Sequence, residues 1–258
     1  MSTEVNVTRM DAFTYRERIA EDGAVLLIPL GTVEQHGPHL PLIVDQLLPT
    51  KMSELVAAEM DRVWVGPTLT FGYKSQQRAG GGNHIVGTIG MDADVVIGTV
   101  RGLVREFARH GLKNLVFVNG HYENYQFMFE GVDLGVRDLQ LAGHQPPQCM
   151  MLSYWDFVSD DVIDTLYGDE FTGWDVEHGG VMETALMLAY FPELVTMDRV
   201  MDHPAADLPK YDLLPVDPSI TPSSGCLSCA KTATAEKGRL LADSIVSGII
   251  ASVSERYR

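Results

Sequence analysis

The chain has 258 residues, of which 45% are hydrophobic, and this size and composition are typical of one globular α/β domain with a sizeable core. Its 35 acidic and 19 basic residues give a formal net charge of −16, which disfavours binding to nucleic acid or to an anionic membrane. The cysteines Cys149, Cys226 and Cys229 cannot all pair with one another, so a secreted disulfide framework is not expected.

In the first half of the chain the predicted elements alternate between helix and strand. In chain order they are a helix capped by Thr8 or Asp11 and ending near residue 20, a strand at 25–30, a helix at 47–60 that starts close to Pro49, a strand at 63–67, and a long glycine-rich loop at 68–90. Loops of that length in compact domains often line a site.

The second half continues the alternation. Its predicted elements are a helix from Asp92 to Gly111, a strand at 115–118, a helix at 124–140, a strand at 148–153, an irregular stretch at 154–180, a helix at 181–190, a proline-rich irregular arm at 204–222, and a helix at 234–255. We expect the arm to cover a site or to pack on a neighbouring subunit.

This order of elements predicts the fold class. Strands that alternate with helices favour a single-domain three-layer α/β/α sandwich with a largely parallel sheet, and no linker divides residues 1–258. Residues 1–20 lack a basic region followed by an apolar core, and no stretch reaches the length of a membrane span, so the expected location is the cytoplasm.

Two clusters of metal-binding side chains follow predicted strands. Glu34, His36 and Asp45 come after the strand at 25–30, and His121 and Glu123 come after the strand at 115–118. Side chains two residues apart project to the same side of an extended segment, and the carboxyl ends of parallel strands meet at one edge of the sheet. Imidazoles and carboxylates together suit zinc or manganese, so the pattern predicts a hydrolytic site with two metals.

Simpler explanations exist for each of these residues when it is taken alone. Asp45 stands where a helix cap is common, and an isolated histidine is more often a hydrogen-bonded structural residue than a metal ligand. The metal hypothesis rests on the joint occurrence of Glu-x-His and His-x-Glu after two separate strands.

Six segments of the sequence resemble the creatininase family. They are LGTVEQHGPHLP, VDQLLPT, FGYKSQQRAGGGNH, VNGHYENYQF, LSYWDF and GWDVEHGGVMET, and matching segments run from about residue 24 to 240. The resemblance implies a metal-dependent cyclic amidohydrolase that converts creatinine to creatine reversibly, with two divalent ions, zinc or manganese or both, and a metal-bridging water. It also implies a homohexamer.

The same resemblance assigns the metal ligands. It implies that Glu34, Asp45 and His121 hold one ion, and that His36, Asp45 and Glu123 hold the other, with Asp45 as the bridge. Glu123 then also serves as the catalytic acceptor of the water's proton.

The resemblance further implies a pocket and a proton donor. Tyr122, Trp155, Trp174 and Asp175 shape the substrate pocket, and His178 transfers a proton to the departing ring nitrogen. The tryptophans are expected to stack on the flat, partly cationic ring.

Some positions do not fit the pattern or carry no clear role. Ala79 stands where the creatininase pattern has a serine, which affects one expected hydroxyl contact. Glu177 and Glu183 are interpreted as ligand-supporting residues or helix-start carboxylates, and neither is expected to be catalytic. Cys226 and Cys229 have CxxC spacing without a second ligand pair, so ordinary thiols are favoured over a redox or metal role.

Alternative functions remain open from the sequence. A related amidase or deformylase that acts on another small cyclic or formylated nitrogen compound uses the same metal motifs. A metal-binding protein without turnover needs no His178, and a glycosidase with paired carboxylates leaves His36 and His121 without a purpose.

Overall fold

A computed structural model describes residues 4–257 and contains a four-stranded, all-parallel sheet in the order β2-β1-β3-β4. The strands are β1 (Val25–Leu30), β2 (Val63–Val65), β3 (Asn114–Asn119) and β4 (Gln148–Ser153). Val25 pairs with Val63 on one side and with Asn114 on the other. The central strands consist largely of buried apolar residues because helices cover both faces of the sheet.

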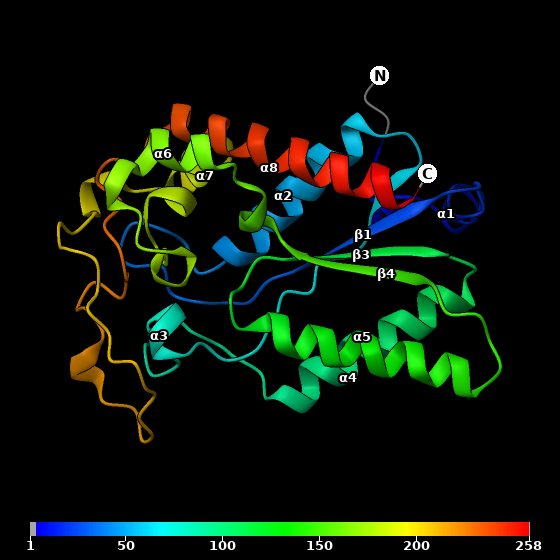
Figure 1. Cartoon of the computed structure of the whole chain (residues 1–258), viewed down its shortest axis with the longest axis horizontal. Coiled ribbons are helices and arrows are strands. Elements are labelled where there is room, and N and C mark those ends of the chain that lie inside the picture. Colours follow the sequence, from blue (N-terminus) through cyan, green and yellow to red (C-terminus); the bar gives the residue numbers. More distant parts are fainter. Residues whose placement is uncertain (1–3, 258) are drawn as a thin grey trace.

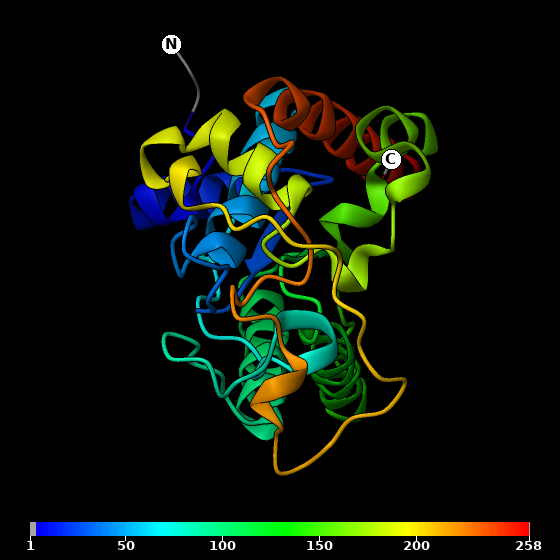
Figure 2. The same ribbon diagram turned by 90° about the vertical axis from the view of Figure 1, so that its left-hand side faces the viewer.

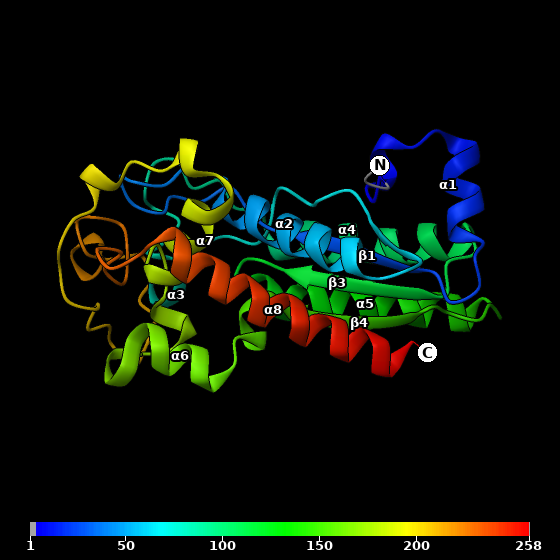
Figure 3. The same ribbon diagram turned by 90° about the horizontal axis from the view of Figure 1, so that it is seen from above.

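Two layers of helices enclose the sheet (Figure 1). One layer contains α2 (Val44–Glu59), α7 (Val181–Tyr190) and α8 (Ala235–Arg256), and the other contains α4 (Ala93–Arg109) and α5 (Asn124–Leu141). Seen from above, α8 runs along the sheet beside α2 (Figure 3). The predicted three-layer sandwich with a parallel sheet is therefore confirmed.

Alternate residues of each strand serve opposite layers. Leu27 and Val116 belong to the core shared with α2, α7 and α8, whereas Leu26 and Phe117 belong to the core shared with α4 and α5. All four side chains are completely buried. This division follows from the two-residue repeat of a strand, and it holds the strand ends rigidly between two cores.

The helices outside the layers are short. They are α1 (Ala12–Ile19), capped by Asp11, α3 (Gln77–Gly80) in the glycine-rich loop, and α6 (Asp160–Tyr167). Helix α6 falls in a stretch predicted to be irregular, because its eight residues bury only Val162 and Leu166 and are too few to show a helical repeat. Within residues 4–257, no helix combines the length and the apolar character needed to cross a membrane.

Helix α2 begins earlier than predicted. It starts at Val44, so Asp45 lies in its first turn and Pro49 lies inside the helix. Gly31 and Gly120, which follow β1 and β3, allow this helix to approach the strand ends closely. A Cβ on Gly31 would lie 2.2 Å from the Asp45 carbonyl oxygen, and one on Gly120 would lie 2.6 Å from the same atom.

The arm at 204–222 lacks regular structure apart from one 3-10 turn at Pro218–Ile220. Its end contacts the α3 region: Thr221 Oγ1 donates to the Gly81 carbonyl at 2.7 Å, and Gln77 Nε2 donates to the Asp217 carbonyl at 2.8 Å. Figure 2 shows this segment crossing the end of the molecule beside α3. The end of the arm therefore packs on the α3 loop at the carboxyl end of the sheet, and its two predicted roles remain predictions.

Candidate metal centre and catalytic pocket

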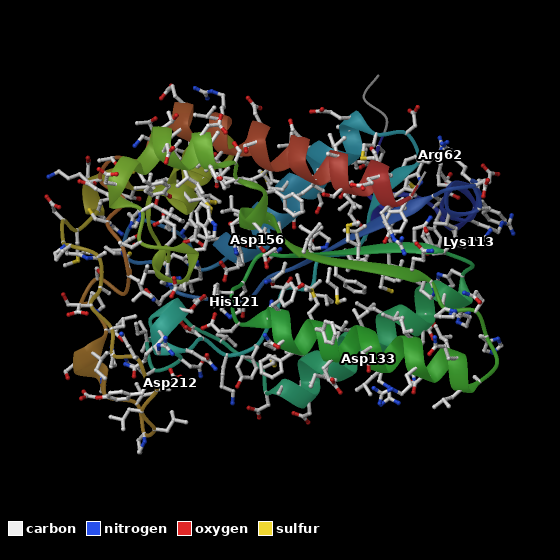
Figure 4. All side chains as sticks on the ribbon, in the orientation of Figure 1. Arg62, Lys113, His121, Asp133, Asp156 and Asp212 are labelled. Atoms are coloured by element: carbon white, nitrogen blue, oxygen red, sulfur yellow. The ribbon has the colours of Figure 1, made fainter. Side chains whose placement is uncertain are left out.

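The two predicted clusters meet at the carboxyl edge of the sheet, where His121 is labelled in Figure 4. His36 Nε2 lies 3.0 Å from Asp45 Oδ1, and His121 Nδ1 lies 3.2 Å from Asp45 Oδ2. His121 Nδ1 is also 3.1 Å from Glu34 Oε2. The two oxygens of Asp45 thus face different imidazoles, which is the arrangement that a bridging carboxylate needs.

Glu123 joins the cluster through a turn. Residues 121–123 were predicted to be extended, but they form a tight turn, and Glu123 has helical backbone angles immediately before α5. Its Oε2 nevertheless lies 3.4 Å from His121 Nε2, while its Oε1 accepts a hydrogen bond from the Gln76 backbone. The prediction of proximity is confirmed, although the local geometry that produces it is different.

Several buried polar atoms of the cluster have no hydrogen-bond partner. These atoms are Glu34 Oε1, His36 Nε2, Asp45 Oδ2 and Glu123 Oε2. Burying polar atoms without partners is costly. Carboxylate oxygens and imidazole nitrogens that lie this close together are the ligand atoms that a divalent cation requires. The residues present therefore fit a metal centre.

A carboxylate not expected in the cluster completes it. Glu183, in the first turn of α7, has its Oε1 3.3 Å from His36 Nε2, and its Oε2 accepts from the Gly179 backbone N–H at 2.6 Å. Three groups of ligand atoms converge here, and two of them share Asp45: Glu34, Asp45 and His121 form one, and His36, Asp45 and Glu183 form the other, while the third consists of Glu34, His36 and His178. The first group is the predicted set, whereas the second contains Glu183 in place of Glu123.

Burial and neighbouring charges together set the pKa values of the side chains in the cluster. Burial raises the pKa of the Glu34 carboxyl to about 7. Burial opposes protonation of His36, but the carboxylates of Glu183 and Asp45 outweigh it and raise the pKa of this imidazole well above its usual value. A site that holds protons on buried imidazoles in this way exchanges them for cations when metal binds.

His178 has the opposite electrostatics. Its imidazole is 6% exposed and lies tilted against His36 with 4.3 Å between ring centroids. Burial, together with the positive charge of His36, holds the pKa of His178 well below its usual value. His178 is consequently neutral in this environment.

A pocket opens onto the metal cluster between aromatic side chains. It is lined by Tyr122, Trp155, Trp174 and His178 along with the cluster carboxylates, and Ala79 also lines it. Tyr122 and Trp155 stand nearly parallel, with ring centroids 6.3 Å apart and planes 17° apart. Trp174 packs edge-on against Phe171 at 4.7 Å in the loop after α6.

Asp175 is placed differently from the other predicted pocket residues. It is exposed and does not line the pocket. It lies close enough to Tyr122 that its charge, after burial, contributes to raising the pKa of the tyrosine hydroxyl. Its predicted contact with substrate remains a prediction.

Glu177 is a structural carboxylate. Its Oε1 accepts from the Tyr167 hydroxyl at 2.5 Å and from the Met182 backbone at 2.6 Å, and its Oε2 accepts from Ser228 at 2.6 Å. With these partners it anchors the loop that carries Trp174 to the start of α7. The roles of Glu177 and Glu183 are therefore distinct, which the sequence did not reveal because both read as carboxylates near the start of one helix.

The parallel α/β/α fold and the paired buried ligand groups define a metal-dependent hydrolase. The sequence matches the Creatininase family, described as creatinine amidohydrolase, over residues 8–253. Creatinine amidohydrolase of Pseudomonas putida is 50% identical over 258 residues, covering 100% of this chain and 99% of that protein. The chain belongs to the creatininase family.

Solved structures agree with this assignment. A creatininase with manganese is 50% identical, with a TM-score of 0.96, and covers 99% of both chains. A glutamate-to-glutamine variant of creatininase of Zn-Zn type is 49% identical, with a TM-score of 0.97, and also covers 99% of both chains. Zinc and manganese are accordingly the metals that suit this site.

Proposed function

We propose that this protein is a creatinine amidohydrolase, which adds water across the cyclic amide of creatinine to give creatine, and which catalyses the reverse reaction. The observation that carries the proposal is the 50% identity to the Pseudomonas putida enzyme over the whole chain. The buried ligand groups and the aromatic pocket beside them support it independently.

The side chains named above supply the metal sites in this proposal. Glu34, Asp45 and His121 would hold one cation, and His36, Asp45 and Glu183 would hold the other, so that Glu183 would replace Glu123 in the ligand set implied by the sequence. When bound, divalent cations lower the pKa of water and polarise a carbonyl oxygen.

Glu123 and His178 transfer the protons in this reaction, with Glu123 as the acceptor and His178 as the donor. Burial raises the pKa of the Glu123 carboxyl, and its unpartnered Oε2 is the atom placed to accept a proton from the attacking water. As the carbon–nitrogen bond of the ring breaks, the departing nitrogen needs a proton. His178 relays to it the proton that Glu123 takes from the water, and because the pKa of His178 is low, the imidazolium formed on the way is a strong donor.

The aromatic walls bind the flat ring. A planar ligand between two parallel rings needs about 7 Å, since each face makes a contact of about 3.5 Å. The 6.3 Å separation of Tyr122 and Trp155 is close to this requirement. The cavity itself has a volume of about 30 Å³, so we propose that substrate enters when the Trp174 loop moves outward.

The deciding experiment measures creatine formed from creatinine by protein reloaded with zinc or manganese, beside a chelator-treated sample. Metal-dependent creatine formation supports the proposal. Absence of turnover in protein shown to contain two metals refutes it and directs the search to formylated and other cyclic amides. The homohexamer and the cytoplasmic location remain predictions, which sizing by light scattering and cell fractionation test.

A further inference from the structure

Gln35 lies between two proposed ligands in the sequence, yet its side chain points to a different set of partners. It is 6% exposed, and its Nε2 lies 2.8 Å from the Gly225 carbonyl, 3.1 Å from His178 Nε2 and 3.4 Å from the Gly80 carbonyl. Its Oε1 accepts from the Gly37 backbone N–H at 3.0 Å. A buried amide with this many partners has a structural or catalytic purpose.

These backbone contacts fix which way the amide points. The Gly37 N–H can only donate, so the atom facing it must be the amide oxygen. The Gly225 carbonyl can only accept, so the atom facing it must be the amide nitrogen. Reversing the amide would place its NH₂ group against the Gly37 N–H, which is also a donor, and its oxygen against the Gly225 carbonyl, which is also an acceptor. The orientation is therefore set by chemistry, which is the test that an amide assignment requires.

The consequence falls on His178. The amide nitrogen has two hydrogens, and its two nearest acceptors are the Gly225 carbonyl at 2.8 Å and His178 Nε2 at 3.1 Å, whereas the Gly80 carbonyl is farther away at 3.4 Å. With one N–H directed at His178 Nε2, that ring nitrogen accepts, and the neutral imidazole carries its proton on Nδ1. We propose that Gln35 is a positioning residue that fixes the orientation and the tautomer of His178. This inference deepens the proposed function and rests on it for the kinetic part of its test.

The surrounding backbone is shaped around this amide. Gly225 has φ +80°, and a Cβ there would lie 2.1 Å from Gln35 Oε1. Gly81 has φ +78°, and a Cβ there would lie 3.1 Å from Gln35 Nε2. Two glycines in left-handed conformations therefore leave the space that the amide occupies.

The same segment also holds the histidine. The backbone N–H of Leu227 donates to the His178 carbonyl at 3.0 Å, two residues beyond the carbonyl that holds Gln35. The segment directly after the arm thus positions both members of the pair, and this gives the residues after the proline-rich stretch a role in the catalytic geometry.

The tautomer decides the route of protons through His178. The neutral ring can pass a proton on only after it has taken one up. The proton that it takes up arrives at Nε2 and breaks the contact with Gln35, and the proton that it passes on then leaves from Nδ1. Fixing a ring nitrogen through the bond made by its partner is a common device in sites of this kind.

The first test observes His178 directly. In zinc-loaded wild-type protein with ¹⁵N- and ¹³C-labelled histidine, solid-state NMR distinguishes the two ring nitrogens, and the His178 signals are those lost in His178→Gln. A proton on Nδ1 supports the proposal. A proton on Nε2 overturns it. This NMR experiment needs no variant of Gln35 and no turnover, so it is independent of the proposed function.

The second test removes the donor. Gln35→Met keeps the shape of the side chain, and we expect a loss in kcat of about 10- to 100-fold, the usual cost of losing an orienting partner, with KM and zinc content retained and the His178 tautomers mixed. Gln77→Met is the matched control, because Gln77 is also buried and bonds the adjoining arm through Asp217 but does not touch His178. Unchanged kcat and tautomer in Gln35→Met overturn the proposal, whereas an equal loss in both variants assigns the effect to the arm and also overturns it. If no variant or wild type hydrolyses creatinine, the proposed function fails while the NMR result still decides the tautomer.

Discussion

Replacing Glu183 with glutamine removes one negative charge from the group that contains His36 and Asp45 while preserving the shape of the side chain. The amide oxygen can still accept from the Gly179 N–H, which lies 2.6 Å from the carboxylate. The structure therefore predicts a local loss of metal affinity rather than unfolding. We expect Glu183→Gln to contain one tightly bound metal per chain instead of two.

The magnitude follows from the spacing of charges in this group. A cation that took the place of the His36 proton would lie no farther from Glu183 Oε1 than about the 3.3 Å to His36 Nε2, and two unit charges at that distance interact by about 5 kcal/mol at an effective dielectric constant of about 20. Desolvation offsets part of this free energy, and half of it still corresponds to a loss of affinity of roughly 70-fold.

Metal content by mass spectrometry, after dialysis against buffered free zinc, measures this effect. Glu123→Gln is the discriminating partner, because we expect it to retain two metals while kcat falls by about 10²- to 10⁴-fold through loss of a proton acceptor. Glu177→Gln is the control for a buried carboxylate and should retain both metals. Two metals of unchanged affinity in Glu183→Gln would refute the ligand assignment.

Four further outcomes are expected. Chelation should lower the free energy of unfolding by about 2.7 kcal/mol per site for metal held at 100 times its Kd, and calorimetry showing no change in Tm contradicts this. Burial lowers the pKa of His39 to about 4, so between pH about 4 and about 6.5 the folded protein binds fewer protons than the unfolded chain. Stability should fall as pH drops through this window, and His39→Gln should flatten the fall by about 2 kcal/mol in denaturant titrations, a value reduced for solvent screening. Gly238→Ala should destabilise the protein by about 3 kcal/mol or more, since its Cβ would lie 1.9 Å from the Ala185 carbonyl oxygen. Gly102→Ala, whose Cβ would have no atom within 4 Å, should stabilise α4 by about 1 kcal/mol. Equal shifts of the urea midpoint in the two variants contradict the packing argument. Trp155→Ala should raise KM for creatinine by about tenfold through loss of ring stacking, and an unchanged KM removes Trp155 from the pocket.

The sequence by itself determined the architecture, because strand and helix patterns are local. The run at 25–30 is apolar throughout since both faces of the sheet are covered, and β1 has these bounds in the structure. The alternation of strands with helices then allowed few topologies other than a parallel sandwich. The sequence likewise located Glu34, His36, His121 and Glu123, because short motifs at strand ends are carried to one edge by the topology.

Only the tertiary structure decided which side chains complete the site. Glu183 is far from Asp45 in the sequence, and nothing local distinguishes it from Glu177; packing of α7 beside α2 aims one carboxylate at His36 and leaves the other bonded to Tyr167 and Ser228. The partnership of Gln35 with His178 likewise depends on Gly225, in an irregular segment after the arm that no periodic pattern describes. Contacts between distant segments are fixed by how whole elements pack, so local patterns could not predict them.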